Sequence, residues 1–232
     1  AITTGGNNIA VGSGALIAVT TVGSLTAVGK SALASNTSGT GNTAVGWEAG
    51  YHNATGINNT IMGWGAMMGA ATANVHSNNT AIGYYAMKLL TTGDNNVAAG
   101  SNAGYAITTS SGTVAIGTDA LKSLTTGNNN TALGYQALQH CVDGEANIAI
   151  GNGALGDWDV GGGTNTTVDT SSFNVMIGRN AGGGAWTNVL SQYNVGIGNY
   201  VMDAAMDGAL NNTALGHNAL SALTGGDYNV VV

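Results

Sequence analysis

The residues of this 232-residue chain that could do acid–base chemistry are few, and one close pair of carboxylates lies in a Gly-rich stretch. Asp157 and Asp159 stand in the string GDWDVGGG. General acid–base catalysis needs two carboxylates that converge on a cleft, and a Gly-rich string does not by itself provide one. We interpret the pair as part of a solvated turn, with a calcium site as the alternative because Ca²⁺ prefers oxygen ligands.

The histidines and the single cysteine do not form a metal or nucleophile motif. His52, His76, His140 and His217 fall in different segments, and only His140 and Cys141 are neighbours. Adjacent residues of a strand point to opposite faces, so this pair would not hold one ion together. We therefore predict no catalytic residue, no cofactor and no metal site. The enzyme alternative that stays open is a polysaccharide lyase built on a β-helix.

Four aromatic residues occur where the chain departs from its regular spacing: Trp158, Phe173, Trp186 and Tyr193. They lie among Asn, Gly and Ser, in extra material that we expect to form loops, which often carry a binding face. Exposed aromatic rings in such surroundings suit a polysaccharide, which they contact by stacking and hydrogen bonding. We predict that these four residues contact a receptor, with packing over a bulging core as the alternative.

Charge and hydropathy exclude two classes of partner. The net charge is -7 and the chain has four Lys and Arg residues, so little can neutralise phosphates and we expect no nucleic-acid partner. No apolar run reaches the roughly 18 residues that a membrane span needs, so we expect no membrane insertion. The hydrophobic fraction of 44% argues against disorder even though 39 residues are Gly and none is Pro.

A repeat organises nearly the whole chain. The string N-x-x-x-G recurs from Asn8 to Gly216, and seven of the eleven intervals between its glycines are 17 residues long, which indicates one structural unit per repeat. Ala stands three residues after each Gly, with Val201 as the exception, and Leu, Met or Gly follows it. This register predicts a solenoid in which each repeat is one coil. The glycines are Gly12, Gly29, Gly46, Gly63, Gly83, Gly100, Gly117, Gly134, Gly151, Gly178, Gly198 and Gly216.

Each repeat predicts a short strand followed by a turn. β-Branched, small and aliphatic residues alternate after the Asn, which is typical of a strand, and stacked strands would form a parallel sheet. After the Gly, apolar residues recur three and four apart, as in YYAMKLLTTG. That spacing predicts a short helical turn, with a second short strand as the alternative. We predict a mainly-β parallel solenoid (β-roll) of about 12–13 coils, as one elongated repeat domain over 1–232.

The alternation also predicts where the side chains point. We expect the aliphatic residue before the Gly, such as Val11 or Leu133, to face the interior, and the Leu or Met after Ala to stay partly exposed. Homo-oligomerisation would bury that stripe. The Asn column should stack its amides, and the Gly should adopt a positive φ or allow close approach. Aromatic residues directly after the Gly are expected to form a packing ladder: Trp47, Trp64, Tyr84 and Tyr135.

Three of the repeats carry a specific likeness. The strings NNTAIGYYAM, NNTALGYQAL and NNTALGHNAL resemble repeats of bacteriophage tail fibres and, more distantly, the head repeats of YadA-like trimeric autotransporter adhesins. The resemblance covers residues 7–232. It implies a non-enzymatic, extended homotrimer that attaches to a surface, located in a virion appendage or at an extracellular surface.

The partners that the resemblance implies are a host surface glycan or other receptor and other virion fibre proteins. The period is longer than that of the adhesin heads, which favours the tail-fibre likeness, and a bacterial surface adhesin of the autotransporter type is the near alternative. An ice-binding solenoid is a further alternative, because one column holds Thr43, Thr60, Thr80, Thr131 and Thr213. We expect 1–232 to be either the whole rod or a segment of a longer fibre.

Overall fold

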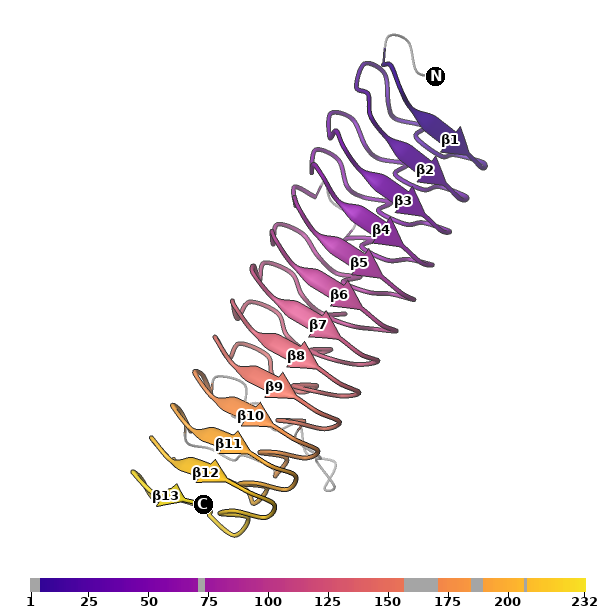
Figure 1. Ribbon diagram of the computed structural model, residues 1–232. Helices are drawn as coiled ribbons and strands as arrows, with labels where there is room; N and C mark the ends of the chain where they lie inside the picture. The colour runs from indigo at the N-terminus through magenta and orange to yellow at the C-terminus, as the bar shows by residue number, and fades with distance from the viewer. Residues whose placement is uncertain (1–4, 71–73, 157–170, 185–189, 207) are drawn as a thin grey trace. The chain divides into compact units, whose positions relative to one another are not determined.

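The structure, a computed structural model, consists of two compact units, residues 1–113 and 114–232. Within each unit, short strands pair in parallel with the strands before and after them in the sequence (Figure 1). The described residues contain no helix. The predicted parallel β-solenoid is therefore confirmed for each unit, whereas a single domain over 1–232 stays a prediction. The described residues are 5–70, 74–156, 171–184, 190–206 and 208–232.

All described strands but the last are three residues long, and within each unit they pair in register with the next repeat, for example Thr43 with Thr60 in unit 1. Unit 1 contains β1 (Ile9–Val11), β2 (Thr26–Val28), β3 (Thr43–Val45), β4 (Thr60–Met62), β5 (Thr80–Ile82) and β6 (Val97–Ala99). Unit 2 contains β7 (Val114–Ile116), β8 (Thr131–Leu133), β9 (Ile148–Ile150), β10 (Val175–Ile177), β11 (Val195–Ile197), β12 (Thr213–Leu215) and β13 (Val230–Val231).

A buried Asn directly before most strands ties each coil to both of its neighbours. In unit 1, the backbone N–H of Asn59 donates to Oδ1 of Asn42 (2.9 Å), and Nδ2 of Asn59 donates to the carbonyl oxygen of His76 (2.8 Å). Asn147 makes the same two kinds of bond in unit 2. Since a buried amide without partners would be costly, this ladder both satisfies the amides and sets the register. The predicted stacking of the Asn column is confirmed.

The residue of each strand that faces the interior is the middle one. Ala44 and Ala132 are fully buried, whereas Val11 is 56% exposed and Leu133 is also exposed. The prediction that the aliphatic residue before the Gly points inward is therefore wrong. Side chains alternate along a strand, so the buried Asn at its start dictates that the inward position comes two residues later. A coil of 17 residues is narrow, and Ala fits the limited space there.

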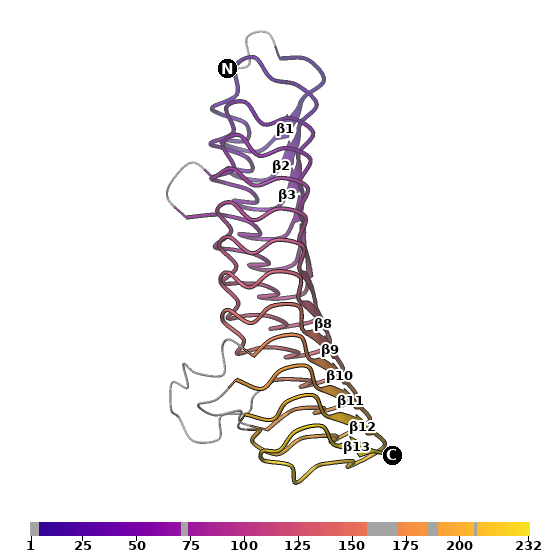
Figure 2. The same ribbon diagram turned by 90° about the vertical axis from the view of Figure 1, so that its left-hand side faces the viewer.

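The opposite wall of each coil comes from the residues that follow the Gly (Figure 2). Leu33 and Met87 in unit 1 and Leu121 and Met202 in unit 2 are fully buried. The prediction that this stripe stays partly exposed is wrong. In unit 2, Met202 belongs to one core cluster with Met176 and small residues of the strands and turns. Large side chains of the turn therefore fill the space that the small strand residues leave.

The segment after the Gly forms a run of turns, and the predicted helical turn is wrong. Ser31 and Leu33 have left-handed φ values of 58° and 49°, and the backbone N–H of Ala32 donates to the carbonyl oxygen of Gly29 (3.4 Å). A right-handed helix requires negative φ at consecutive residues, so the alternate left-handed positions exclude it. The same left-handed φ values exclude a second strand, which requires extended backbone. The N–H of Leu33 donates to the carbonyl oxygen of Ala49 in the next coil (3.0 Å).

The Gly after most strands is required for two reasons at once. Gly29 in unit 1 has φ +139°, and a Cβ built on it would collide with the carbonyl oxygen of Gly46 in the next coil. Gly134 in unit 2 has φ +143° and the same conflict with Gly151. Residues with a Cβ avoid both the conformation and the contact. The predicted positive φ and the predicted close approach are both confirmed.

Candidate functional site

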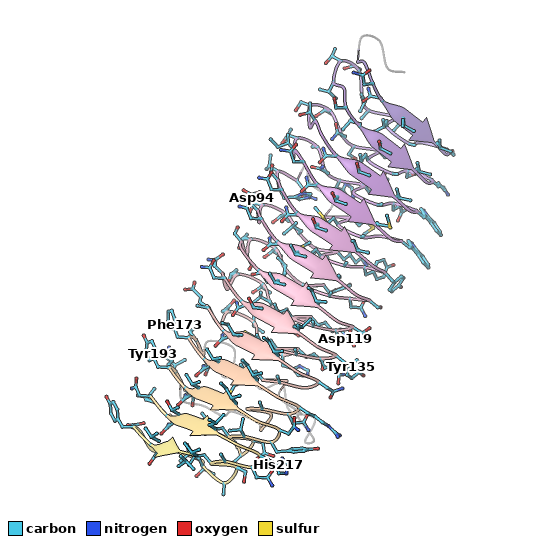
Figure 3. All side chains as sticks on the ribbon, viewed as in Figure 1. Asp94, Asp119, Tyr135, Phe173, Tyr193 and His217 are labelled. Atoms are coloured by element: carbon cyan, nitrogen blue, oxygen red, sulfur yellow. The ribbon has the colours of Figure 1, made fainter. Side chains whose placement is uncertain are left out.

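Two exposed aromatic side chains lie together at the start of β10 and β11 in unit 2. Phe173 and Tyr193 stack with ring centroids 5.2 Å apart and planes 10° from parallel, and Figure 3 shows them side by side at the strand starts. Phe173 is 45% exposed and Tyr193 is 52% exposed. These two members of the predicted receptor set are therefore brought together. Trp158 and Trp186, the other two, lie outside the described residues.

The backbone of this pair adopts a conformation that aromatic residues rarely take. The φ values are 61° at Phe173 and 59° at Tyr193, and the equivalent residues of most other coils are Asn or Gly, such as Asn129 with φ 60°. A left-handed conformation costs a residue other than Gly about 1 kcal/mol or more, and least for Asn. Because both rings are half-exposed, core packing does not offset that cost. Strain without burial favours a role in binding.

The outer faces of the stacked pair border small residues. One repeat before Phe173 the same position holds Ala146, and one repeat after Tyr193 it holds Asn211. Among the described residues, the rings of Phe173 and Tyr193 make ring contacts only with each other. No other described aromatic ring covers the outer face of Phe173 or Tyr193. We call Phe173, Tyr193 and the equivalent Tyr228 the open aromatic column.

Tyr228 was missed in the sequence analysis. It stands directly before Asn229, as Phe173 stands before Asn174, with φ 58° and 78% of its surface exposed. An aromatic residue directly before the column Asn was the signal that could have found it. Polar groups accompany this edge of unit 2: the side chains of Glu145 and Asp227 are exposed, and Oδ1 of Asp227 accepts a hydrogen bond from the N–H of Leu210 (2.9 Å).

A second set of rings lies at the other end of the strands in unit 1. Trp47 and Trp64 stack with centroids 5.1 Å apart and planes 1° from parallel, and Tyr84 meets Trp64 edge-on at 5.4 Å. Nζ of Lys30 lies 5.4 Å from the centroid of the Trp47 ring. We call Trp47, Trp64 and Tyr84 the closed aromatic column, because both faces of Trp64 meet other rings. The predicted packing ladder is confirmed for these three. Tyr135, its fourth expected member, lies at the end of β8 in unit 2 (Figure 3).

The outward face of the sheet carries no charge in either unit and consists of aliphatic and Thr side chains. None of the described strands contains a charged residue. Outward residues at the first and third strand positions are Thr or aliphatic, apart from Ala99, and Met62 in unit 1 and Leu215 in unit 2 are nearly half exposed. The exposed large members are Ile9, Val11, Met62, Ile82, Val97, Ile116, Leu133, Ile197, Leu215 and Val230.

The described residues do not assemble a metal site, because no three His, Cys, Asp or Glu side chains come together there. Asp157 and Asp159 lie outside the described part of the chain. No helix in that part is long and apolar enough to cross a membrane. No family model, curated protein or solved structure matches this chain.

Proposed function

We propose that this chain is a non-enzymatic, extended fibre protein of the phage tail-fibre type, which associates as a homotrimer and attaches to a host surface glycan. The observation that carries the proposal is the uncharged, exposed outer face of the parallel sheet. The protein would act in a virion appendage, together with other fibre proteins. A bacterial surface adhesin would use the same two surfaces.

The outer sheet face suits copies of the same chain. Parallel sheets are almost always covered on both faces, and large apolar patches on soluble proteins mark interaction sites. Exposed residues such as Ile82 and Leu215 face water in a single chain. Because the strands carry no charge of either sign, two such faces meet without repulsion or desolvated ions. The resemblance to trimeric fibre repeats supports three copies.

Size-exclusion chromatography with light scattering tests the association. We expect the wild-type protein to have three times the mass of one chain, and Ile82→Lys or Leu215→Lys to lower that mass, because a buried lysine would be unpaired. Thr92→Lys is the control, because Thr92 is exposed in a turn of unit 1. A wild-type protein that stays monomeric at high concentration would overturn the proposed trimer.

The open aromatic column supports attachment to a glycan. Aromatic faces stack on the apolar faces of sugar rings, while the neighbouring polar groups can bond hydroxyls. The net charge of -7, with Glu145 and Asp227 exposed at the same edge, favours a neutral glycan over an acidic one. Repeated weak contacts along three chains would add up through multivalency.

Affinity electrophoresis in gels containing dextran, mannan or hydroxyethyl cellulose, with alginate as the anionic comparison, tests this attachment. We expect retardation by a neutral polysaccharide, and at least a tenfold weaker interaction in Tyr193→Asn. The substitution keeps a residue that suits the left-handed backbone. Tyr135→Asn is the matched control, an exposed tyrosine at the opposite end of a strand. If Tyr193→Asn and Tyr135→Asn are retarded equally, the open aromatic column does not bind the polysaccharide.

Ice binding is the second candidate, favoured by one observation. The Thr residues at the first strand position of unit 1, such as Thr43 and Thr60, point outward in register and are exposed. A flat column of Thr is typical of ice-binding solenoids. The column also contains Ile9 and Val97, and a trimer would cover it. Thermal hysteresis of a monomeric sample would establish this candidate, and we expect none.

A further inference from the structure

The interior of unit 1 holds a group of buried polar side chains that make no hydrogen bond at most of their polar atoms. Asn36, Asn53, Asn74 and His76 are at most 2% exposed. Both amide atoms of Asn36 and Asn74, Oδ1 of Asn53 and both ring nitrogens of His76 have no hydrogen-bond partner in any other described residue. Leaving such a buried group unpaired costs about 1–3 kcal/mol. Several together would be a large cost for one small unit.

Three of these side chains follow one another in successive coils. Asn36 and Asn53 lie one 17-residue repeat apart, each six residues before a member of the Asn ladder. Asn53 then pairs with Asn74 through an isolated parallel bridge. His76 belongs to the same coil as Asn74, at the position that is Gly56 one coil earlier. We call these four residues the polar column, because they follow one another through adjacent coils.

The same position is apolar elsewhere. Six residues before the ladder position stand Val19, Leu90 and Ile107 in unit 1, and Leu124 and Met206 in unit 2, all fully or almost fully buried. The polar side chains thus replace core residues in only part of unit 1. They do so next to the one irregular interval of that unit, the 20 residues from Gly63 to Gly83.

The unpaired atoms define what kind of ligand would satisfy them. Burial lowers the pKa of His76 to about 4, so the ring is neutral at pH 7 and offers one donor and one acceptor. The amides add donors at Nδ2 of Asn36 and Asn74 and acceptors at Oδ1 of all three Asn residues. A cation would satisfy only the acceptors and an anion only the donors. Water satisfies both, and buried water commonly makes about three such bonds.

We propose that Asn36, Asn53, Asn74 and His76 bind a string of ordered water molecules inside unit 1. This hydrated column replaces the apolar filling of the neighbouring coils. It allows the solenoid to accommodate a longer coil without leaving buried amides unpaired.

Oxygen-17 magnetic relaxation dispersion of the full chain in solution tests the proposal, because it detects water held inside a protein. We expect a dispersion for the wild-type protein and a loss of most of it in Asn36→Leu/Asn53→Leu/His76→Gly, which restores residue types found at these positions in other coils. Cys141→Leu is the matched control, because Cys141 takes the same position in unit 2. We expect it to leave the dispersion unchanged. Equal dispersions in the wild-type and triple variant would overturn the proposal.

Three further measurements keep the proposal testable if the triple variant fails to fold. His76→Gly alone should lose part of the dispersion, and an unchanged amplitude would count against the site. Asn53→Leu should leave the denaturation midpoint unchanged or lower it, since it displaces bound water; a raised midpoint would indicate an unhydrated amide and overturn the proposal. Calorimetric titration with Zn²⁺ should give no heat that depends on His76. Heat lost in His76→Gly would assign the site to a metal instead.

Discussion

The two aromatic columns have nearly the same spacing and opposite settings. In the closed aromatic column of unit 1, Trp64 has a ring on each side, and Lys30 lies over the outer ring. In the open aromatic column of unit 2, Phe173 and Tyr193 stack only on each other among the described residues. A spacing of about 5 Å follows from the strand ladder in both cases. The two columns differ in what lies next to the stacked rings: further rings and Lys30 in the closed column, and no other described ring in the open column.

The backbone under the two columns sharpens this difference. The closed column follows the Gly at the end of each strand, where the variable residue has an ordinary φ, whereas the open column occupies left-handed positions. Rings that pack on one another need no unusual backbone, and rings that cost strain while staying exposed are poor stabilisers. The closed column therefore stabilises unit 1, and the open column is available to a ligand. The interiors differ too, because the polar column with His76 belongs to unit 1.

The largest expected effect is a pH dependence of the stability of unit 1, which contains the buried His76. The pKa of His76 is about 4 in the folded chain and has the ordinary value of 6.5 when unfolded, because burial disfavours the charged ring. Between these values the unfolded chain binds a proton that the folded chain does not. The free energy of unfolding of unit 1 should thus fall as the pH drops from 6.5 to 4, by on the order of 3 kcal/mol, and level off below.

Denaturant unfolding at pH 7.5, 5.5 and 4 measures this loss. Burial is the largest influence on the pKa of His76, and a hydrogen bond with its own backbone and the carboxylate of Asp94 act in the opposite direction by raising the pKa. His76→Gly should remove most of the pH dependence in this window. His217→Gln changes an exposed histidine and should leave it intact. A pH dependence that survives in His76→Gly would contradict the prediction.

The next largest effect concerns the closed aromatic column. Trp64→Ala removes three ring contacts, with Trp47, Tyr84 and Tyr85, together with half-buried apolar surface, and each aromatic pair is worth about 0.5–1.5 kcal/mol. We expect the free energy of unfolding to fall by about 2 kcal/mol, measured by chemical denaturation of the full chain. Tyr135→Ala removes an exposed ring that has no aromatic partner among the described residues and should cost much less. Equal losses would mean that stacking does not distinguish the closed column.

In the open aromatic column we expect a substitution to affect glycan binding rather than stability. Tyr193→Asn loses one stacked pair but relieves the left-handed backbone, so the free energy of unfolding should change by no more than about 0.5 kcal/mol. Glycan retardation should nevertheless be lost. Denaturation and affinity electrophoresis on the same sample separate the two effects. A stability loss as large as that of Trp64→Ala would make the open column a packing feature like the closed one.

The smallest expected effect is a change in glycan retardation when the open aromatic column is extended by one more ring. Asn211 lies between Tyr193 and Tyr228 in the same position of successive coils, with φ 58°. Asn211→Tyr would add a ring there at a backbone cost of about 1 kcal/mol. If rings in this column contact a neutral glycan, retardation should increase several-fold. Weaker retardation would indicate that the ligand needs the free face of Tyr193.

Much of the fold could be predicted from residue spacing. The register of Asn and Gly predicted the solenoid, the stacked amides and the Gly corners, because equivalent residues of a repeat occupy equivalent places in every coil. The side-chain directions were predicted wrongly at Val11 and Leu33, since hydropathy suggested that the larger aliphatic residue of the strand fills the interior. Of the candidate site, Phe173 and Tyr193 were predicted and Tyr228 was not. Composition alone does not indicate which column a residue belongs to.

The sequence by itself determined the repeat, the strand in each coil and the near absence of charge, since these depend on residue types at fixed spacings. Only the tertiary structure decided which face of the strand is buried, because the buried Asn before the strand directs the middle residue inward, against the Leu or Met of the turn. It also decided which rings meet and which stay open. Those contacts depend on backbone conformation and on the neighbouring coil, and neither can be inferred from the identity of one residue.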